Sequence, residues 1–505
     1  MKSDYDVIVV GGGGSGLAAA VSAAENGAEV VLLEKNPQLG GTTGIAIGSF
    51  TANRTRLQRR AGIDDALDDH AEDAGKFAPA EIEACNNRVQ RRFFLSQGAD
   101  TFDWLTGMGV SFYGPSPEPP NRVPRMHNVL PNAKAYVATL QARLLRLAGT
   151  IHCEAPVREL IREQGRVVGV LADVEGSRVT LRASRGVILA TGDYANSPEV
   201  IAEYKGPQFA HIEGIDATAT GDGHRLARQA GARLLNMHVT YGPEIRFVPP
   251  PHRDVTQILP TKGLPARLMG RLMPWVPKFV VHAMIKRLLV TWQHPENSLF
   301  DHGAILVNAR GERFCNERVG PDREVAIARQ PDKICYIVLD ERLIELYSAW
   351  PHFISTAPKI AYAYVADYLR LRPDVAAADP ALAGVARRRG LPEKALQTTV
   401  EAFNGYAAGS QPDPWGRAGD RRPLEGICWV LLGPAKAYFT TTEGGAAIDE
   451  ANRVLDESGR PIAGLYAVGQ VGLGGMILWG HGLHIAWALT SGRLAGRHAA
   501  AAGPA

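Results

Sequence analysis

The stretch Tyr5–Lys35, YDVIVVGGGGSGLAAAVSAAENGAEVVLLEK, indicates how the fold is built. The apolar run Val7–Val10 is typical of a buried strand, and the alanine-rich segment Leu17–Glu25 is typical of a helix. Asn26-Gly27 ends that helix, and Val30–Leu33 follows as a second apolar run. A strand, a helix and a strand in this order predict a βαβ unit, and with it an α/β fold with a parallel sheet.

Glycines stand between the first predicted strand and the helix in the pattern G-x-G-x-x-G, at Gly11, Gly13 and Gly16. Without side chains, the backbone can turn tightly and approach a pyrophosphate, which the helix N-terminus stabilises. Glu34 ends the second strand, where a carboxylate can accept hydrogen bonds from a ribose. These features together predict a dinucleotide site, and a glycine-rich turn without a nucleotide is the alternative.

A second glycine cluster, KNPQLGGTTGIAIGSF, follows at Lys35–Phe50. A plain nicotinamide domain has no need of it. At this point the chain resembles the flavoproteins of the fumarate reductase, succinate dehydrogenase and 3-ketosteroid dehydrogenase superfamily, in which a glycine-rich loop wraps the FAD diphosphate. The resemblance assigns that loop to Gly40, Gly41, Thr42 and Thr43, and it implies that Ala46 to Gly48 lie near the isoalloxazine.

The resemblance extends along nearly the whole chain. GVILATGDYANSPEV at Gly186–Val200 resembles the strand-then-ATG motif of these proteins, and TATGDGHRLARQAGARL at Thr218–Leu234 resembles their TGDG helix. GAILVNARGERFCNE at Gly303–Glu317 resembles their substrate-domain hairpin. GRPIAGLYAVGQ at Gly459–Gln470 resembles their GLYAAGE segment, with glutamine in place of the acid. The FAD-binding residues that the resemblance implies are Gly11, Gly13, Gly14, Ser15, Gly16, Glu34, Lys35, Gly40, Gly41, Thr42, Thr43, Ala46, Gly48, Val157, Ala190, Thr191, Gly192, Asp222, Gly469, Gln470, Gly482, His484 and Ile485.

The same matches predict two domains. Residues 1–240 and 426–505 are expected to form a discontinuous, Rossmann-like FAD-binding domain of the glutathione reductase type. Residues 241–425 are expected to form an inserted α+β cap domain that binds the substrate. Within the cap, Gly263–Trp292 combines arginines and lysines with apolar residues and has no acid. Such a segment can contact an anionic membrane surface, line an apolar substrate channel or form a core helix pair.

Two absences refine the expected cofactor chemistry. Gly40–Gly48 contains no histidine of the kind that attaches flavin covalently in the complex-bound dicarboxylate enzymes, so FAD is expected to be non-covalent. No second G-x-G-x-x-G opens another βαβ unit, so the chain is expected to have no NAD(P)H domain. A separate electron acceptor or donor, such as a quinone, an electron carrier or oxygen, must then exchange electrons with the flavin.

The C-terminal stretch GGMILWGHGLHIAWALTSGR at Gly474–Arg493 is where the resemblance places the flavin edge and the start of the last helix. Trp479 stands where fumarate reductases have a carboxylate-binding arginine, and Thr441 stands near their substrate histidine. Leu478 stands where ketosteroid dehydrogenases use a tyrosine. Arg323 is a candidate for a displaced relative of the proton-donating arginine. The candidate catalytic residues are His481, Gly482, Tyr241 and Tyr438, with the Gly482 N–H as an oxyanion donor.

The expected function is a flavin-dependent oxidoreductase that desaturates or reduces a carbon–carbon bond next to a carbonyl, by hydride transfer at FAD N5 and proton transfer by a tyrosine or histidine. The aromatic and aliphatic residues near Trp479 favour an apolar, cyclic ketone or enone, steroid-like or smaller. Two alternatives stay open. One is a redox-neutral FAD-dependent isomerase or hydratase, and the other is a non-catalytic flavin-binding protein.

Composition narrows the partners and the compartment. The chain of 505 residues has 45% hydrophobic residues and a net charge of only +3, with no basic stripe, so no nucleic acid partner is expected. The five cysteines are an odd number and widely spaced, which argues against a disulfide framework or a metal site. With no signal or membrane-spanning pattern, the expected location is cytoplasmic, with peripheral membrane association through residues 263–292 as an option.

Overall fold

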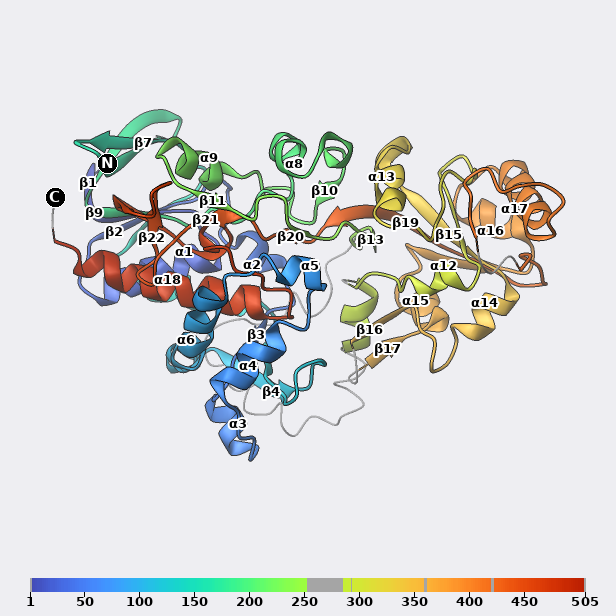
Figure 1. Cartoon of the computed structure of the whole chain (residues 1–505), viewed down its shortest axis with the longest axis horizontal. Coiled ribbons are helices and arrows are strands. Elements are labelled where there is room, and N and C mark those ends of the chain that lie inside the picture. Colours follow the sequence, from blue (N-terminus) through green and yellow to red (C-terminus); the bar gives the residue numbers. More distant parts are fainter. Residues whose placement is uncertain (1, 252–284, 292, 358–360, 419–421, 504–505) are drawn as a thin grey trace.

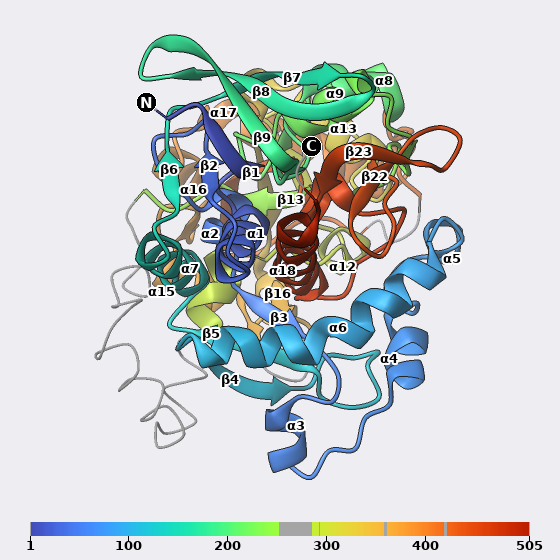
Figure 2. The same cartoon turned by 90° about the vertical axis from the view of Figure 1, so that its left-hand side faces the viewer.

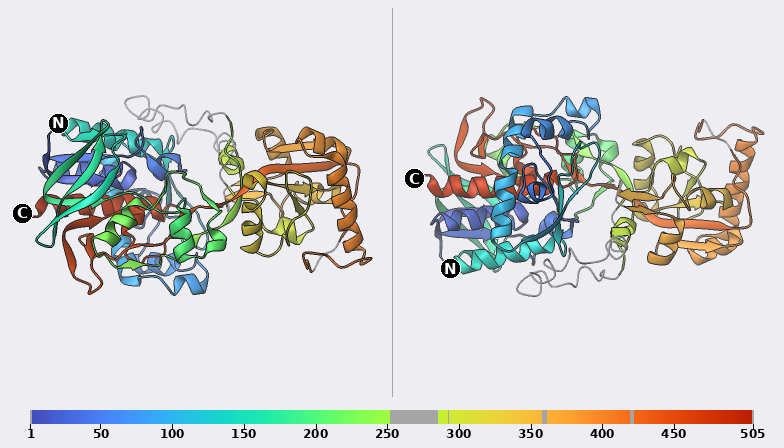
Figure 3. Two further views of the ribbon diagram at one scale, coloured as in Figure 1. Left: turned by 90° about the horizontal axis from the view of Figure 1, so that it is seen from above. Right: turned by 90° about the horizontal axis from the view of Figure 1, so that it is seen from below.

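The computed structural model describes residues 2–251, 285–291, 293–357, 361–418 and 422–503. These residues form two lobes, which a long strand, β19 (Trp429–Phe439), connects (Figure 1). Seen from above and from below, the lobes lie end to end with a narrow junction between them (Figure 3). Each lobe has its own hydrophobic core and its own central sheet.

The sheet of the first lobe confirms the predicted βαβ unit. Its strands follow the order β22-β23-β9-β1-β2-β6, with β8 paired to β9 and β7 paired to β8. β1 pairs in parallel with both β2 and β9, and its last four residues are buried, as the unbroken apolar run predicts. The strands are β1 (Asp4–Val10), β2 (Val30–Leu33), β6 (Thr150–His152), β7 (Val157–Glu163), β8 (Arg166–Val174), β9 (Ser177–Leu189), β22 (Arg453–Leu455) and β23 (Pro461–Ala467).

Two helices from opposite ends of the chain lie side by side on this sheet (Figure 2). They are α1 (Gly14–Glu25), in the βαβ unit, and α18 (Leu483–Ala501), the last helix. A Cβ atom at Gly492 of α18 would lie 2.3 Å from the Ser15 carbonyl oxygen, and one at Gly496 would lie 2.2 Å from the Ala19 carbonyl oxygen. The backbones of the two helices therefore touch, and α18 holds the start of α1 in place.

The rest of the first lobe consists of short helices and small sheets. One sheet has the order β3-β5-β4, and β11 pairs with β21 and β12 with β20. These strands are β3 (Ser49–Thr51), β4 (Ser111–Ser116), β5 (Met126–Leu130), β11 (Leu234–Leu235), β12 (Thr240–Tyr241), β20 (Thr441–Thr442) and β21 (Gly445–Ala446). The helices are α2 (Gly41–Ile45), α3 (Arg56–Arg60), α4 (Leu67–Ala74), α5 (Ala80–Glu83), α6 (Arg88–Gly107), α7 (Lys134–Arg146), α9 (Asp222–Gln229) and η5 (Gly469–Gly472). α8 (Pro198–Tyr204) and η1 (Pro207–Phe209) precede β10, and Ile201 of α8 is buried in the second core.

The second lobe is built around β19. Its sheet has the order β10-β19-β15-β14, and β13 and β18 also pair with β19. The other strands of this lobe are β10 (Glu213–Gly214), β13 (Glu244–Phe247), β14 (Ile305–Val307), β15 (Cys335–Leu339), β16 (Ser355–Ala357), β17 (Ala361–Ala363) and β18 (Ala376–Asp379). Its helices are α12 (Ser298–Asp301), α13 (Asp322–Ala328), η4 (Pro331–Lys333), α14 (Glu341–Leu346), α15 (Val365–Leu371), α16 (Leu382–Arg388) and α17 (Glu393–Ala407).

An α/β first lobe with an inserted mixed lobe confirms the predicted fold class. The predicted domain boundaries at 240 and 426 stay a prediction: β10, before the first boundary, and β19, after the second, both belong to the sheet of the second lobe. Most of the segment 263–292 lies outside the described residues. Residues 285–291 form a helix, in which Leu289 and Val290 are buried in the second core.

Candidate functional site

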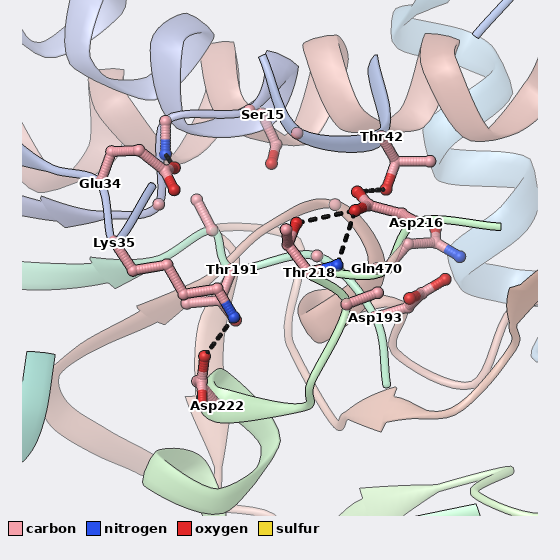
Figure 4. A pocket seen from close by; sticks show the side chains of 18 of the residues that line it. Ser15, Glu34, Lys35, Thr42, Thr191, Asp193, Asp216, Thr218, Asp222 and Gln470 are labelled. Atoms are coloured by element: carbon pink, nitrogen blue, oxygen red, sulfur yellow. Dashed lines mark hydrogen bonds and ion pairs between the residues drawn. The ribbon is translucent and has the colours of Figure 1, made fainter. Parts of the chain in front are cut away.

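A cavity of about 440 Å³ lies at the start of α1 and receives side chains from both ends of the chain. Its walls come from the ends of β1 and β2, from α2, from the loops after β6 and β9, from the segment 216–226, and from the start of α18. Figure 4 shows side chains that surround it. The predicted cofactor residues that line it are Gly11, Gly13, Gly14, Ser15, Glu34, Lys35, Gly41, Thr42, Thr43, Ala46, Val157, Ala190, Thr191, Gly192, Asp222, Gly469, Gln470, His484 and Ile485.

The glycine motif lets α1 begin directly at the end of β1. Gly11 has a φ of +108°, and a Cβ atom there would lie 2.4 Å from the Ala190 carbonyl oxygen. A Cβ atom at Gly16 would lie 1.9 Å from the Gly11 carbonyl oxygen. Gly13 is the N-cap of α1 and gives it no side-chain cap. The N–H groups of the first turn therefore face the cavity as an anion-binding end.

One end of the cavity has the groups expected for an adenosine. The Glu34 carboxylate is buried and accepts the Gly12 N–H at 2.6 Å and the Asn36 N–H at 2.8 Å. Next to it, Lys35 and Asp222 form an ion pair of 2.7 Å (Figure 4). Burial raises the pKa of the Asp222 carboxyl, but the Lys35 ammonium outweighs it, so the net shift is downward. Fixed in this way, the Glu34 carboxylate keeps lone pairs for ribose hydroxyls.

The opposite end contains a chain of hydrogen bonds that the sequence did not reveal. The Gln470 amide donates to Thr441 Oγ1 at 2.7 Å, and the Thr441 hydroxyl donates to Asp193 Oδ2 at 2.7 Å. Burial raises the pKa of the Asp193 carboxyl. Gln470 Oε1 and Thr191 Oγ1 are buried without a hydrogen-bond partner among the described residues. An unpaired buried acceptor is costly, so both atoms fit a ligand with hydroxyl or N–H donors.

Four predicted cofactor residues do not line the cavity: Gly16, Gly40, Gly48 and Gly482. These glycines allow close packing or backbone conformations that other residues rarely adopt. Gly16 allows α1 to pack against β1, and Gly40, with a φ of +137°, precedes α2. Gly48 has a φ of +95° and a Cβ atom there would lie 2.5 Å from a Val129 methyl group. Gly482 has a φ of +81° and is the N-cap of α18.

His481 and Gly482 lie beside the cavity, just before His484, which lines it. Glu118 Oε1 accepts the His481 backbone N–H at 2.9 Å and lies 2.5 Å from His481 Nδ1. Desolvation lowers the pKa of the His481 imidazole, but the hydrogen bond and charge of Glu118 outweigh it and raise the pKa above its ordinary value of 6.5. The side chain of His481 is 51% exposed, and its Nε2 has no hydrogen-bond partner among the described residues. The Gly482 N–H has no acceptor among the described residues.

Glu118 belongs to the segment between β4 and β5, which an ion-pair network holds. Arg125 is fully buried and pairs with Asp65 at 2.7 Å and with Asp73 at 2.6 Å. Arg122 also pairs with Asp73, at 3.1 Å. The sequence around Glu118 is rich in proline and has no period, so no local signal pointed to it. Only the fold brings this carboxylate to His481.

The two candidate tyrosines lie in different surroundings. The ring of Tyr241 packs edge-on against that of Trp479, with centroids 4.9 Å apart. Burial and the charge of Glu244 raise the pKa of Tyr241 to about 12. Tyr438 lies on β19, where burial, with a contribution from Glu213, raises its pKa to about 12. Tyr241 thus packs on a residue that lies two positions before His481, whereas Tyr438 pairs across the second sheet with Glu213 of β10 and Glu244 of β13.

Arg323 lies in the second core rather than beside the cavity. Its guanidinium is 7% exposed, pairs with Glu324 at 2.5 Å and lies over the Phe300 ring at 4.8 Å. Arg246, which is closer to His481, pairs with Glu244 at 2.9 Å and donates to Thr440 Oγ1 at 3.0 Å. These two arginines are therefore engaged by acids, and neither is arranged as an open clamp for a dicarboxylate.

Three features show that the cavity fits FAD. The glycine turn and the start of α1 suit a pyrophosphate, Glu34 suits a ribose, and the unpaired Gln470 Oε1 suits a donor of the ribityl chain or ring. With the phosphates between these ends, a bound flavin ring would lie at the end lined by Ala46, Thr441 and His484, which is called the ring end below.

Comparison with known proteins agrees with this geometry. A family model described as an FAD binding domain matches residues 6–482. Over 505 residues, covering 98% of this chain and 77% of its relative, the chain is 27% identical to a fumarate reductase (cytochrome) of Shewanella frigidimarina. It is 26% identical over 544 residues to 4-oxocyclohexanecarboxylate 2-dehydrogenase of Sinomonas cyclohexanicum, covering 93% of this chain and 88% of the relative.

Solved structures share the fold. The open conformation of a flavocytochrome c3 fumarate reductase matches with a TM-score of 0.71 and 25% identity, over 99% of this chain and 78% of that one. The 3-ketosteroid delta1-dehydrogenase of Sterolibacterium denitrificans matches with a TM-score of 0.64 and 19% identity, over 99% of this chain and all of that one. Among the described residues, no helix has the length and apolar character needed to cross a bilayer, and no cluster of metal-ligating side chains occurs.

Proposed function

The chain belongs to the FAD-binding-domain family, and we propose that its substrate is an apolar, cyclic ketone or enone. Like its relatives, it is an FAD-dependent oxidoreductase that acts on carbon–carbon double bonds or their saturated counterparts. The reacting bond lies next to the carbonyl. The observation that supports this proposal best is the His481–Glu118 pair, placed beside the Gly482 N–H and the ring end of the cavity.

The residues of the chain supply proton transfer and charge stabilisation in this proposal. FAD, when bound, supplies hydride exchange with the carbon β to the carbonyl. The Gly482 N–H donates to the carbonyl oxygen and stabilises the negative charge that develops there. His481 Nε2 exchanges the proton of the α carbon, while Glu118 holds Nδ1 and so fixes the orientation of the ring.

The charge of His481 favours one direction. Glu118 raises the pKa of the imidazole, so a larger fraction of His481 is protonated at neutral pH. An imidazolium gives a proton to the α carbon, as the reduction of an enone requires. Desaturation needs the neutral imidazole as a base and is therefore favoured at higher pH.

The surroundings of His481 favour an apolar substrate. The rings of Tyr241 and Trp479 pack against each other. Ile477 and Leu478, which directly precede Trp479, are buried aliphatic residues. Arg246, the described arginine near His481, is paired with Glu244 and is not arranged as an open clamp for a dicarboxylate. The relative from Sinomonas cyclohexanicum, whose name gives a cyclic ketone as substrate, supports this choice.

Further parts of the proposal concern cofactor attachment and electron exchange. We expect FAD to be non-covalent, because the loop Gly40–Gly48 contains no histidine. We expect the electrons to pass to or from a separate carrier, because no second G-x-G-x-x-G opens another βαβ unit in the sequence. The name of the Shewanella relative includes a cytochrome, which supports an external carrier for this chain too.

The test is anaerobic mixing of the FAD-loaded protein with a panel of cyclic ketones and of the reduced protein with the corresponding enones, followed at the flavin absorbance. The proposal expects bleaching by at least one cyclic ketone or recovery of colour with its enone. Fumarate, succinate and a cinnamate-type acid are the comparison compounds. Turnover with these and none with any cyclic ketone or enone would overturn the substrate proposal.

A further inference from the structure

A second histidine–glutamate pair lies at the ring end of the cavity. His484 lines the cavity and is the second residue of α18. Its Nε2 lies 2.9 Å from Glu443 Oε1, and Glu443 Oε2 accepts the Leu478 N–H at 3.3 Å. The Glu443 side chain is 0% exposed, while that of His484 is 25% exposed. The histidine thus stands between the buried acid and the cavity.

A fully buried carboxylate needs a cation or several donors to remain ionised. Among the described residues, no lysine or arginine lies within ion-pair distance of Glu443, so His484 is its only partner that can be charged. With Nε2 engaged by Glu443, Nδ1 is the ring nitrogen that remains, and it has no hydrogen-bond partner among the described residues. In the imidazolium form, Nδ1–H is a donor for a group in the cavity.

We propose that Glu443 and His484 stabilise negative charge on reduced FAD and thereby raise the reduction potential of the bound cofactor. His484 acts directly, because it lines the cavity, and Glu443 acts through it, because its buried carboxylate lies 2.9 Å from Nε2 and orients the ring. The start of α18 adds the partial positive charge of a helix N-terminus at the same place. The proposal depends on FAD binding alone and not on the identity of the substrate.

The other groups around the pair do not supply this positive charge. Tyr241, whose pKa is raised to about 12, and the buried Tyr194 both lie near Glu443 as neutral phenols. Asp193 is linked to Gln470 through Thr441, and it would add negative rather than positive charge. Arg246 is paired with Glu244. His484 is therefore the described side chain at this end of the cavity best placed to respond to reduction.

The experiment measures the midpoint potential of FAD bound to wild-type protein and to the variants His484→Gln, Glu443→Gln and His498→Gln, in the absence of substrate. The affinity for oxidised FAD is measured in parallel. His484→Gln and Glu443→Gln should each reduce the preference for reduced over oxidised FAD at least tenfold, which is about 30 mV for a two-electron couple. His498 lies near the other end of α18, so His498→Gln should leave the potential unchanged.

Two results would overturn the proposal. In the first, His484→Gln weakens binding of oxidised and reduced FAD equally, which gives an unchanged potential and a purely structural role. In the second, Glu443→Gln raises the potential, which means that the negative charge of Glu443, and not an imidazolium, acts on the cofactor. If Glu443→Gln does not fold, the midpoint potentials of His484→Gln and His498→Gln are compared, and equal values overturn the proposal.

Discussion

At the residue scale, the central feature is His481, whose ring is oriented by the Glu118 carboxylate. Glu118 and His481 are 363 positions apart, yet one carboxylate oxygen contacts both the backbone N–H and the ring of the histidine. This double contact fixes the ring, and about half of the side chain stays exposed. The arrangement is that of a general acid or base with an orienting partner.

His481→Ala should retain FAD and lower the rate of flavin reduction or reoxidation by its substrate about a hundredfold or more, the usual share of a general acid or base. Glu118→Gln keeps a hydrogen-bond acceptor but removes the charge that raises the pKa of His481. In the reductive direction, where the imidazolium is the active form, the rate of Glu118→Gln should therefore decline at a lower pH than the wild-type rate. Stopped-flow pH profiles measure both effects.

His498→Ala is the matched control, because His498 lies near the other end of α18, and this variant should keep a rate close to that of the wild type. A wild-type rate in His481→Ala would assign the histidine a structural role at the start of α18. Tyr241, which packs on Trp479, would then be the residue to test next.

At the scale of elements, the contact between α1 and α18 decides whether the phosphate-binding turn is in place. Gly492 and Gly496 leave no room for a side chain between the two helices. Gly107, at the end of α6, has no atom within 4 Å of an added Cβ. Gly496→Ala should thus lower the free energy of unfolding by about 1–3 kcal/mol through overpacking. Gly107→Ala should be neutral or stabilise by up to about 1 kcal/mol.

Urea unfolding of the two variants in parallel, with FAD in excess, measures these changes. Because α18 supports the start of α1, Gly496→Ala should also weaken FAD binding, and Gly107→Ala should not. Equal stability of both variants would show that the two helices can separate at no cost, contrary to the close approach in the structure.

At the scale of the whole molecule, three buried histidines make the fold sensitive to acid. Burial lowers the pKa of His127 and of His224 to about 4, and it also lowers that of His70. Each is neutral in the folded protein at a pH where the unfolded chain, with a histidine pKa near 6.5, is already protonated. Between about pH 6.5 and pH 4 the unfolded state binds more protons, so stability falls as the pH falls through this window.

The expected loss is about 1.4 kcal/mol per pH unit for each such histidine. His224→Gln, which removes one of them and keeps a donor for the Gly444 carbonyl, should show a smaller loss of stability between pH 7 and pH 5 than the wild type. The measurement is urea unfolding with saturating FAD at both pH values. An identical pH dependence in the variant and the wild type would contradict the assignment.

The sequence by itself determined the βαβ unit, the glycine turn, the acid at the end of β2 and most of the cavity lining. The first three rest on contacts between neighbours in the chain, whereas most of the lining was implied by the resemblance to a flavoprotein family. The spacing of apolar residues dictates the strand and the helix, and the glycines between them dictate how closely α1 can approach Ala190. A pattern within some thirty residues was therefore enough to predict a dinucleotide site, and the family resemblance narrowed that prediction to FAD.

Only the tertiary structure decided which polar groups meet at the ring end of the cavity. Glu118 reaches His481 across 363 positions, Asp193 reaches Thr441 across 248, and Glu443 reaches His484 across 41. No periodicity links such residues, because their partners come from different strands, loops and helices. Their protonation also depends on burial and on neighbouring charge, which exist only once the chain is folded.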